Sequence, residues 1–162
     1  FTEEKPLSDE SGCSAPFPLR VSGLGQGIKL DPPAIINCAT AERLAEFTRD
    51  VVVPEAKKAF GQDVKATRQA SGYVCRPRNG TQKLSEHAFG NAIDIAAFVL
   101  RDGTEIAVEA TRDPERSAFL SRVRTAACGP FTTVLGPGSD PDHATHFHWD
   151  MAKRRKGSAF CQ

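Results

Sequence analysis

The sequence lacks an excess of charge of either sign. Its 21 Lys and Arg residues nearly balance its 20 Asp and Glu residues, which leaves a formal net charge of only +1. Proteins that bind nucleic acid or anionic membranes through bulk electrostatics carry a clear positive surplus. We therefore expect no nucleic-acid partner.

The sequence also lacks a long apolar run. The longest one, residues 92–100, is interrupted by Asp94, whereas a membrane-spanning helix needs about 20 apolar residues. The content of 40% hydrophobic and 25% charged residues is typical of a globular protein and excludes disordered, collagen-like and coiled-coil classes. We expect a single globular unit with no membrane span, acting as a monomer.

No C-x-x-C pair is present, although the chain has five cysteines. They are widely scattered: Cys13, Cys38, Cys75, Cys128 and Cys161. This spacing excludes a zinc ribbon and a thioredoxin-like site. It favours at least two long-range disulfides, with one thiol left over and no connectivity implied, and hence an oxidising compartment. The alternative is a set of reduced core cysteines in a cytosolic protein.

The fold class that we predict is α+β. Residues 1–37 are rich in Pro and Gly and predict an extended arm with few regular elements that packs on the core. Residues 38–162 form the globular unit, with no internal repeat or linker. Short strands are predicted at residues 64–71, 92–100, 104–109, 131–135 and 146–151, with a hairpin turn at Asp102-Gly103.

Two helices are predicted from apolar periodicity and capping residues. The first starts at Thr40 as N-cap, has Leu44, Phe47 and Val51 at helical spacing, and is either kinked or restarted at Pro54 before ending at Gly61. The second begins with Asp113 as cap and Pro114 in the first turn, and buries a stripe that is formed by Phe119, Leu120 and Val123.

Three of the four histidines lie within six residues, at positions 143, 146 and 148. Strand alternation over residues 146–151 places His146, His148 and Asp150 on one face and the apolar residues on the other. One histidine can then bind a metal while the other meets a metal-bound water, or both can be ligands. The alternative is a surface histidine pair on an edge strand.

His87 precedes Asp94 by seven residues, and Asp94 lies within an apolar strand. A buried carboxylate is costly unless it is paired, hydrogen-bonded or bound to metal. With one histidine of the later strand, these residues make the three-ligand set of a catalytic zinc, whereas a closed structural site needs four ligands. Otherwise Asp94 belongs to a hydrogen-bonded turn or pairs with Arg76 or Arg78.

Two groups of residues carry a family resemblance. The segment Ser85-x-His87-x-x-Gly90-x-Ala92-x-Asp94, followed by His146-x-His148, resembles the zinc-site signature of D-alanyl-D-alanine carboxypeptidases, penicillin-insensitive murein endopeptidases and hedgehog-type domains. Residues 71–76 and 131–138, together with the spread of cysteines, resemble the bacterial extensin-like C-terminal domain family.

The resemblance implies a hedgehog/DD-peptidase-like zinc peptidase fold, with a small antiparallel sheet and flanking helices over residues 38–162. It implies a periplasmic or secreted protein that binds Zn²⁺ and cleaves peptidoglycan stem peptides. The implied zinc ligands are His87, Asp94 and His148. A cross-link endopeptidase of DD or LD type is favoured. The alternatives are a D,D- or L,D-carboxypeptidase and a non-catalytic, zinc-stabilised cell-wall-binding module.

The catalytic roles are implied in the same way. His146 is the expected proton carrier, with His143 as a second histidine near the zinc. Carboxypeptidase relatives use a Glu-x-x-His motif with glutamate as base, but position 143 is His and position 145 is Thr, which favours a histidine base. Arg76 resembles the arginine that holds a substrate carboxylate or oxyanion. Its alternative is a surface arginine beside a disulfide.

Overall fold

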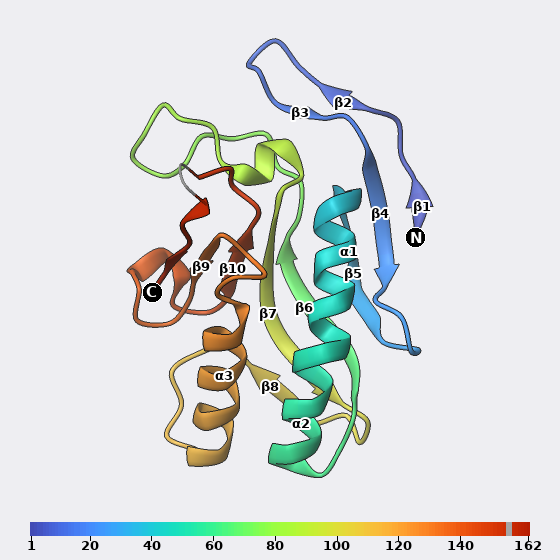
Figure 1. The fold of residues 1–162 in the computed structure, drawn as a ribbon, viewed down its shortest axis with the longest axis vertical. Helices are drawn as coiled ribbons and strands as arrows, with labels where there is room; N and C mark the ends of the chain where they lie inside the picture. Colours follow the sequence, from blue (N-terminus) through green and yellow to red (C-terminus); the bar gives the residue numbers. More distant parts are fainter. Residues whose placement is uncertain (155–156) are drawn as a thin grey trace.

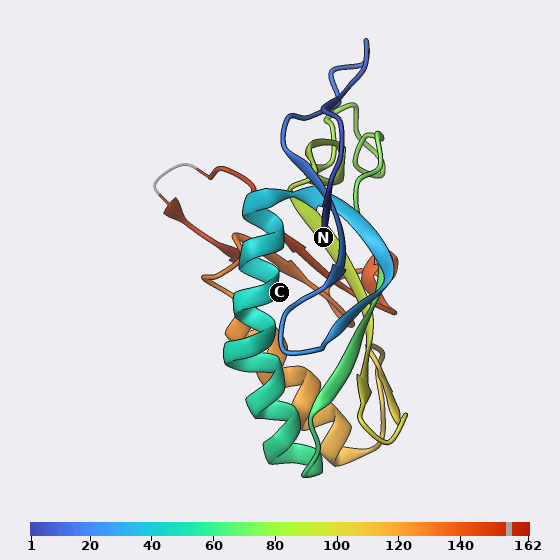
Figure 2. The ribbon, with the colours of Figure 1, turned by 90° about the vertical axis from the view of Figure 1, so that its right-hand side faces the viewer.

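The protein has a mixed α+β fold in which helices cover one face of a large sheet (Figures 1 and 2). The structure is a computed structural model that describes residues 1–154 and 157–162. The helical elements are α1 (Cys38–Phe47), the π turn η1 (Thr48–Val52), α2 (Val53–Phe60), the 3₁₀ turns η2 (Glu86–Phe89) and η3 (Pro141–His143), and α3 (Pro114–Ala127). The strands are β1 (Thr2–Glu3), β2 (Leu7–Ser8), β3 (Ser14–Ala15), β4 (Pro18–Gly23), β5 (Lys29–Asn37), β6 (Val64–Ser71), β7 (Ala92–Leu100), β8 (Glu105–Ala107), β9 (Thr133–Leu135), β10 (Phe147–Asp150) and β11 (Phe160–Cys161).

The sheet is larger than the small antiparallel sheet that we expected. It has nine strands in the order β1-β4-β5-β6-β7-β10-β9-β11, with β8 paired to β7. Two neighbouring pairs, β5–β6 and β9–β11, are parallel and the others are antiparallel. A parallel pair needs a crossover connection, and the helical segment 38–60 supplies it between β5 and β6.

The prediction of few regular elements in residues 1–37 is wrong for residues 18–37, which form β4 and β5 of the main sheet. The two prolines that argued against a strand lie where β5 changes partner. Residues 29–31 pair with β6, and residues 34–37 and Lys29 pair with β4, while Pro32 and Pro33 have no register partner. Their missing N–H groups therefore cost the ladder little.

The first predicted helix is continuous from Cys38 to Phe60 because the π turn η1 accommodates Pro54 without breaking the helix. Pro54 has no N–H to donate to the carbonyl four residues earlier, and the backbone N–H of Val53 bonds to the Thr48 carbonyl in the wider π pattern. Gly61 ends the helix with φ 67°, as predicted. Thr40 was wrongly expected as N-cap: the cap position is Asn37, and Thr40 is buried inside the helix.

The predicted caps and buried stripe of α3 are confirmed. The Asp113 carboxylate accepts hydrogen bonds from the backbone N–H groups of Glu115 and Arg116 at 3.0 and 3.1 Å. Pro114 is the first helical residue, and Phe119, Leu120 and Val123 are buried.

The predicted strands at residues 64–71 and 92–100 match β6 and β7 in full. Gly103, with φ 98°, makes the expected turn into β8. The other three strands are shorter than predicted, because the ladder covers only residues 105–107, 133–135 and 147–150. His146 consequently lies one residue before β10.

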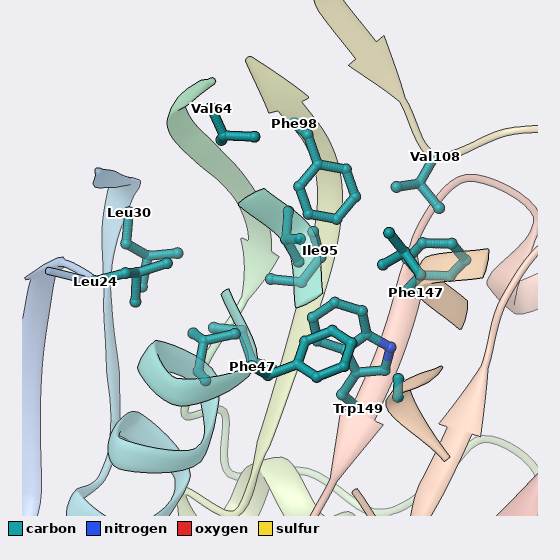
Figure 3. Close-up of a cluster of buried hydrophobic side chains, with 14 of the residues drawn as sticks. Leu24, Leu30, Phe47, Val64, Ile95, Phe98, Val108, Phe147 and Trp149 are labelled. Atoms are coloured by element: carbon teal, nitrogen blue, oxygen red, sulfur yellow. The ribbon is translucent and has the colours of Figure 1, made fainter. Parts of the chain in front are cut away.

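An aromatic cluster joins the sheet to α1 (Figure 3). The Trp149 ring is 5.1 Å from that of Phe47, 5.1 Å from that of Phe131 and 5.7 Å from that of Phe147, between ring centroids. All four side chains are buried. Since alternate residues of a strand face opposite sides, His148 and Asp150 lie on the sheet face that is turned away from α1.

Two disulfides link distant segments, as the cysteine spacing predicted. Cys13 pairs with Cys75 and Cys128 pairs with Cys161, while Cys38 is free and exposed. No helix in the described part of the chain is long and apolar enough to cross a membrane.

Candidate metal centre

Three elements position the predicted ligands. His148 of β10 is the register partner of Asp94 on the neighbouring strand β7, and directly paired residues have adjacent side chains on one sheet face. His87 lies in the 3₁₀ turn η2, which precedes β7. The sequence thus brings one side chain from each of two paired strands together with one from a short turn.

The Ser and Gly of the Ser85-x-His87-x-x-Gly90 pattern shape that turn. The Ser85 hydroxyl accepts a hydrogen bond from the backbone N–H of His87 at 3.4 Å. Gly90 ends the turn with φ 65°, and a Cβ there would lie 3.0 Å from the Asn37 backbone nitrogen. Only glycine fits this left-handed, closely packed position without strain.

Three ligand atoms converge on one point. The Nε2 atom of His87 lies 3.2 Å from Nδ1 of His148 and 3.2 Å from Oδ1 of Asp94, and the latter two atoms are 3.0 Å apart. A zinc ion with bonds of 2.0–2.1 Å at tetrahedral angles separates its ligand atoms by about 3.3 Å. The triangle therefore has the size that zinc requires.

The outward nitrogen of each imidazole has an acceptor. Nδ1 of His87 lies 2.7 Å from the Gly72 carbonyl oxygen, and Nε2 of His148 lies 3.1 Å from Oδ2 of Asp150. These nitrogens therefore carry the protons, since only a donor satisfies an oxygen acceptor. Such outer partners fix the tautomer of a metal-binding histidine and raise its basicity.

The inward atoms are then three electron-pair donors facing one another, which repel unless a proton or a metal ion lies between them. In the metal-free protein a proton takes that place. Burial opposes protonation of His148, but hydrogen bonds to Asp150 and Asp94 outweigh it and raise the pKa of His148 to about 9. Burial likewise raises the pKa of Asp94, and its contacts with His148 and His87 outweigh burial and hold that pKa well below its usual value. The donor set fits zinc.

His146 and His143 lie beside this set. Nε2 of His146 is 3.8 Å from Oδ1 of Asp94, and the His143 ring centroid is 5.2 Å from that of His146 and 5.6 Å from that of His148. Burial lowers the pKa of His146. All four histidines of the chain line one pocket of about 400 Å³.

Arg76 lies at the wall of the same pocket, half-buried. The only hydrogen bond that its side chain makes within the described residues is a 3.4 Å contact to the Pro77 carbonyl, so its charge is not neutralised by a carboxylate. It is also next to the Cys13–Cys75 disulfide, as its alternative interpretation held. Arg78 instead pairs with Glu86 at 3.3 Å, so neither arginine is the partner of Asp94.

Two carboxylates in the site were given no role from the sequence. Asp150 was placed on the face of His148 but not recognised as its hydrogen-bond partner. Asp140 contacts the His143 ring with both oxygens, at 2.7 and 2.8 Å from Nδ1. The available signals were the spacings His-x-Asp on a strand and Asp-Pro-x-His at a turn.

A further group of metal-ligand side chains, formed by Asp9, Cys13 and Cys75, does not make a metal site, since both cysteines are bonded to each other in a disulfide. Within the described residues the His87, Asp94 and His148 set is therefore the candidate metal centre.

Comparison with known proteins assigns the chain to a family. No curated protein and no solved structure matches the chain. The family model for the extensin-like protein C-terminus matches residues 1–162. Because this match spans the entire sequence, the chain belongs to the extensin-like protein C-terminus family.

Proposed function

We propose that this chain is a zinc-dependent peptidase that hydrolyses peptide bonds of bacterial peptidoglycan, acting on cross-links as an endopeptidase. The observation that carries the proposal is the open set of three ligand atoms beside two further histidines. A structural zinc site is closed by four protein ligands, whereas a catalytic site keeps one position open. Here the position left for a fourth ligand is open to the pocket.

The residues of the proposed active site fall into two groups, zinc ligands and proton carriers. His87, Asp94 and His148 would hold the zinc ion, with Gly72 and Asp150 orienting the two imidazoles. Bound zinc would activate a water molecule and polarise the scissile carbonyl. His146 and His143 would move protons between the nucleophile and the leaving amine, a task for which imidazole is the side chain that enzymes use most often.

The unpaired guanidinium of Arg76 supports a peptide substrate with a free carboxylate. Arg76 has no carboxylate partner among the described residues and lines the pocket, so its guanidinium is available to a substrate anion. The stem peptides of peptidoglycan carry such groups. We propose this class of substrate, and a hedgehog/DD-peptidase-like arrangement of the fold around the site.

The disulfides support a periplasmic or secreted location. Bridges form and persist in oxidising compartments and are rare in the cytosol, and the chain has two. Such a location would bring the enzyme to its substrate.

The test is digestion of purified muropeptides by the zinc-loaded protein, with disaccharide-peptide monomers and cross-linked dimers supplied separately and products identified by mass. We expect conversion of dimers to monomers, abolished in His87→Ala. Trimming of monomers instead would indicate a carboxypeptidase. Binding of sacculi without cleavage of either substrate would indicate the cell-wall-binding module and overturn the proposal.

A further inference from the structure

The turn that carries His143 is built around the Asp140 side chain. Asp140 is the N-cap of η3, and its Oδ1 atom accepts a hydrogen bond from the backbone N–H of His143 at 3.1 Å. Pro141 occupies the first position of the turn, where its missing N–H is of no consequence. The cap geometry therefore brings the Asp140 carboxylate against the His143 side chain.

The same carboxylate holds the imidazole. Oδ1 and Oδ2 of Asp140 lie 2.7 and 2.8 Å from Nδ1 of His143. Both oxygens are acceptors, because the hydrogen bonds from His143 outweigh the effect of burial and keep the pKa of Asp140 below its usual value. Nδ1 must therefore carry the proton, which leaves the lone pair of the ring on Nε2.

His146 differs from His143 in this respect. Among the described residues no hydrogen bond to either ring nitrogen of His146 is formed, and its nearest ionic neighbour is Asp94 at 3.8 Å. An imidazole without a partner samples both tautomers and several rotamers, whereas a base held by a carboxylate is preorganised. Of the two histidines beside the metal ligands, only His143 is oriented by a third group.

We propose that Asp140 is a positioning residue that fixes the His143 imidazole as the Nδ1–H tautomer and thereby makes Nε2 of His143 a proton carrier of the site. The inference rests on the proposed function, since a proton carrier requires a reaction. It adds Asp140 to the residues of the site and names Nε2 as the atom of His143 that moves the proton. The positioning itself is a property of the protein without substrate, and it can be measured separately.

Two variants of Asp140 distinguish its role as the N-cap of η3 from its contact with the His143 imidazole. Asp140→Ser retains a good N-cap but is too short to reach the imidazole. Asp140→Asn retains the size and the Oδ1 acceptor, and replaces the second acceptor Oδ2, 2.8 Å from Nδ1, with an amide donor. Asp113→Ser is the matched control, because Asp113 caps α3 in the same way and does not line the pocket.

The first measurement is the ¹⁵N chemical shifts of the His143 ring in the zinc-loaded protein, assigned by comparison with His143→Ala. We expect a fixed Nδ1–H tautomer in the wild type and in Asp113→Ser, averaged tautomers in Asp140→Ser, and a weaker preference for Nδ1–H in Asp140→Asn, which keeps one of the two acceptor oxygens. An unchanged His143 tautomer in Asp140→Ser would overturn the inference.

The second measurement is muropeptide cleavage. Asp140→Ser should lower kcat by about 10²-fold, the lower end of the range for general acid–base catalysis, with KM and zinc content unchanged. The double variant Asp140→Ser/His143→Ala should be no slower than His143→Ala, since residues that act as a unit are not additive. Fully additive losses would overturn the inference. If the wild type cleaves no muropeptide but the His143 tautomer still depends on Asp140, the proposed function is rejected and the positioning role of Asp140 stands.

Discussion

The imidazoles of His87 and His148 are directed inward by the partners of their outer nitrogens. Gly72 supplies a backbone carbonyl and Asp150 a carboxylate, and a Cβ at residue 72 would lie 2.7 Å from the Ile35 carbonyl oxygen. Glycine is thus required where the chain passes close to β5, and its carbonyl is thereby placed beside His87.

The two histidines of the His146-x-His148 pair should respond differently to substitution. His148→Ala removes a proposed ligand, so zinc affinity and muropeptide cleavage should fall together. The affinity should fall by more than about 10- to 100-fold, which is the loss typical of removing a hydrogen-bond partner of a metal ligand. His146→Ala should keep its zinc and lose rate, mostly in kcat. Elemental analysis after dialysis and steady-state kinetics check both. Equal loss of zinc from the two variants would make His146 a ligand.

Zinc binding to the metal-free protein should release about one proton at about pH 7.5. The pKa of His148 is raised to about 9 in the absence of metal, so a proton occupies Nδ1 at that pH and zinc must displace it. The part of the release that comes from His148 should decline as the pH rises above 9, whereas ionisation of a zinc-bound water would continue to contribute. Calorimetry in buffers of different ionisation enthalpy measures it, with His146→Ala as control, since burial lowers the pKa of His146. Zinc uptake without proton release would contradict the assignment of His148 as a ligand.

At the scale of elements, a hydrogen bond joins two segments that border the pocket. The loop between β6 and η2 carries Arg76, and the Asn79 side chain of this loop donates a hydrogen bond to Asp142 of η3 at 2.8 Å. The loop is also anchored at Cys75 by its disulfide. These attachments tie the loop that carries Arg76 to η3, which carries His143, and to the N-terminal segment.

Loss of that contact should loosen the pocket without affecting the metal ligands. Asn79→Ala should increase hydrogen exchange in residues 76–84 and raise KM for muropeptides severalfold, with zinc content unchanged, because a single hydrogen bond contributes about 1 kcal/mol. Gln62→Ala is the matched control, since it removes a similar amide-to-carboxylate bond, to Asp102 at 2.7 Å, outside the pocket. Equal exchange rates in the two variants would show that the contact does not restrain the loop.

At the scale of the molecule, the disulfides fasten the two ends of the chain. Cys13 ties the N-terminal segment to the loop after β6, and Cys161 ties β11 to the end of α3. The sequence separations of 62 and 33 residues correspond to about 4 kcal/mol of unfolding free energy for each bridge in the chain-entropy model.

Reduction should therefore lower the Tm markedly. Thiol titration in denaturant should find one reactive cysteine before reduction, Cys38, and five after it. Calorimetric melting with and without reductant measures the change in stability, and Cys38→Ser is the control that should leave the Tm unchanged. Five free thiols in protein from an oxidising source would contradict the pairing.

The sequence by itself determined the features that depend on local geometry. The bounds of β6 and β7 and the start of α3 follow from side-chain periods of 2 and 3.6 residues and from the Asp113 cap, and the alternation around His148 placed it opposite the apolar face. Strand alternation together with the cost of burying Asp94 predicted a metal set before any contact was known.

Only the tertiary structure decided the features that depend on pairing between distant segments. β4 and β5 were missed because the Pro and Gly content of residues 1–37 argues locally against strands, and the position of Pro32 and Pro33 between two partners is a property of the sheet. The disulfide connectivity and the Gly72 carbonyl beside His87 depend likewise on which segments the fold brings together. Asp140 and Asp150 belong to this class as well: their spacing to a histidine was visible, but a hydrogen bond requires a distance and a direction, which only the packed chain supplies.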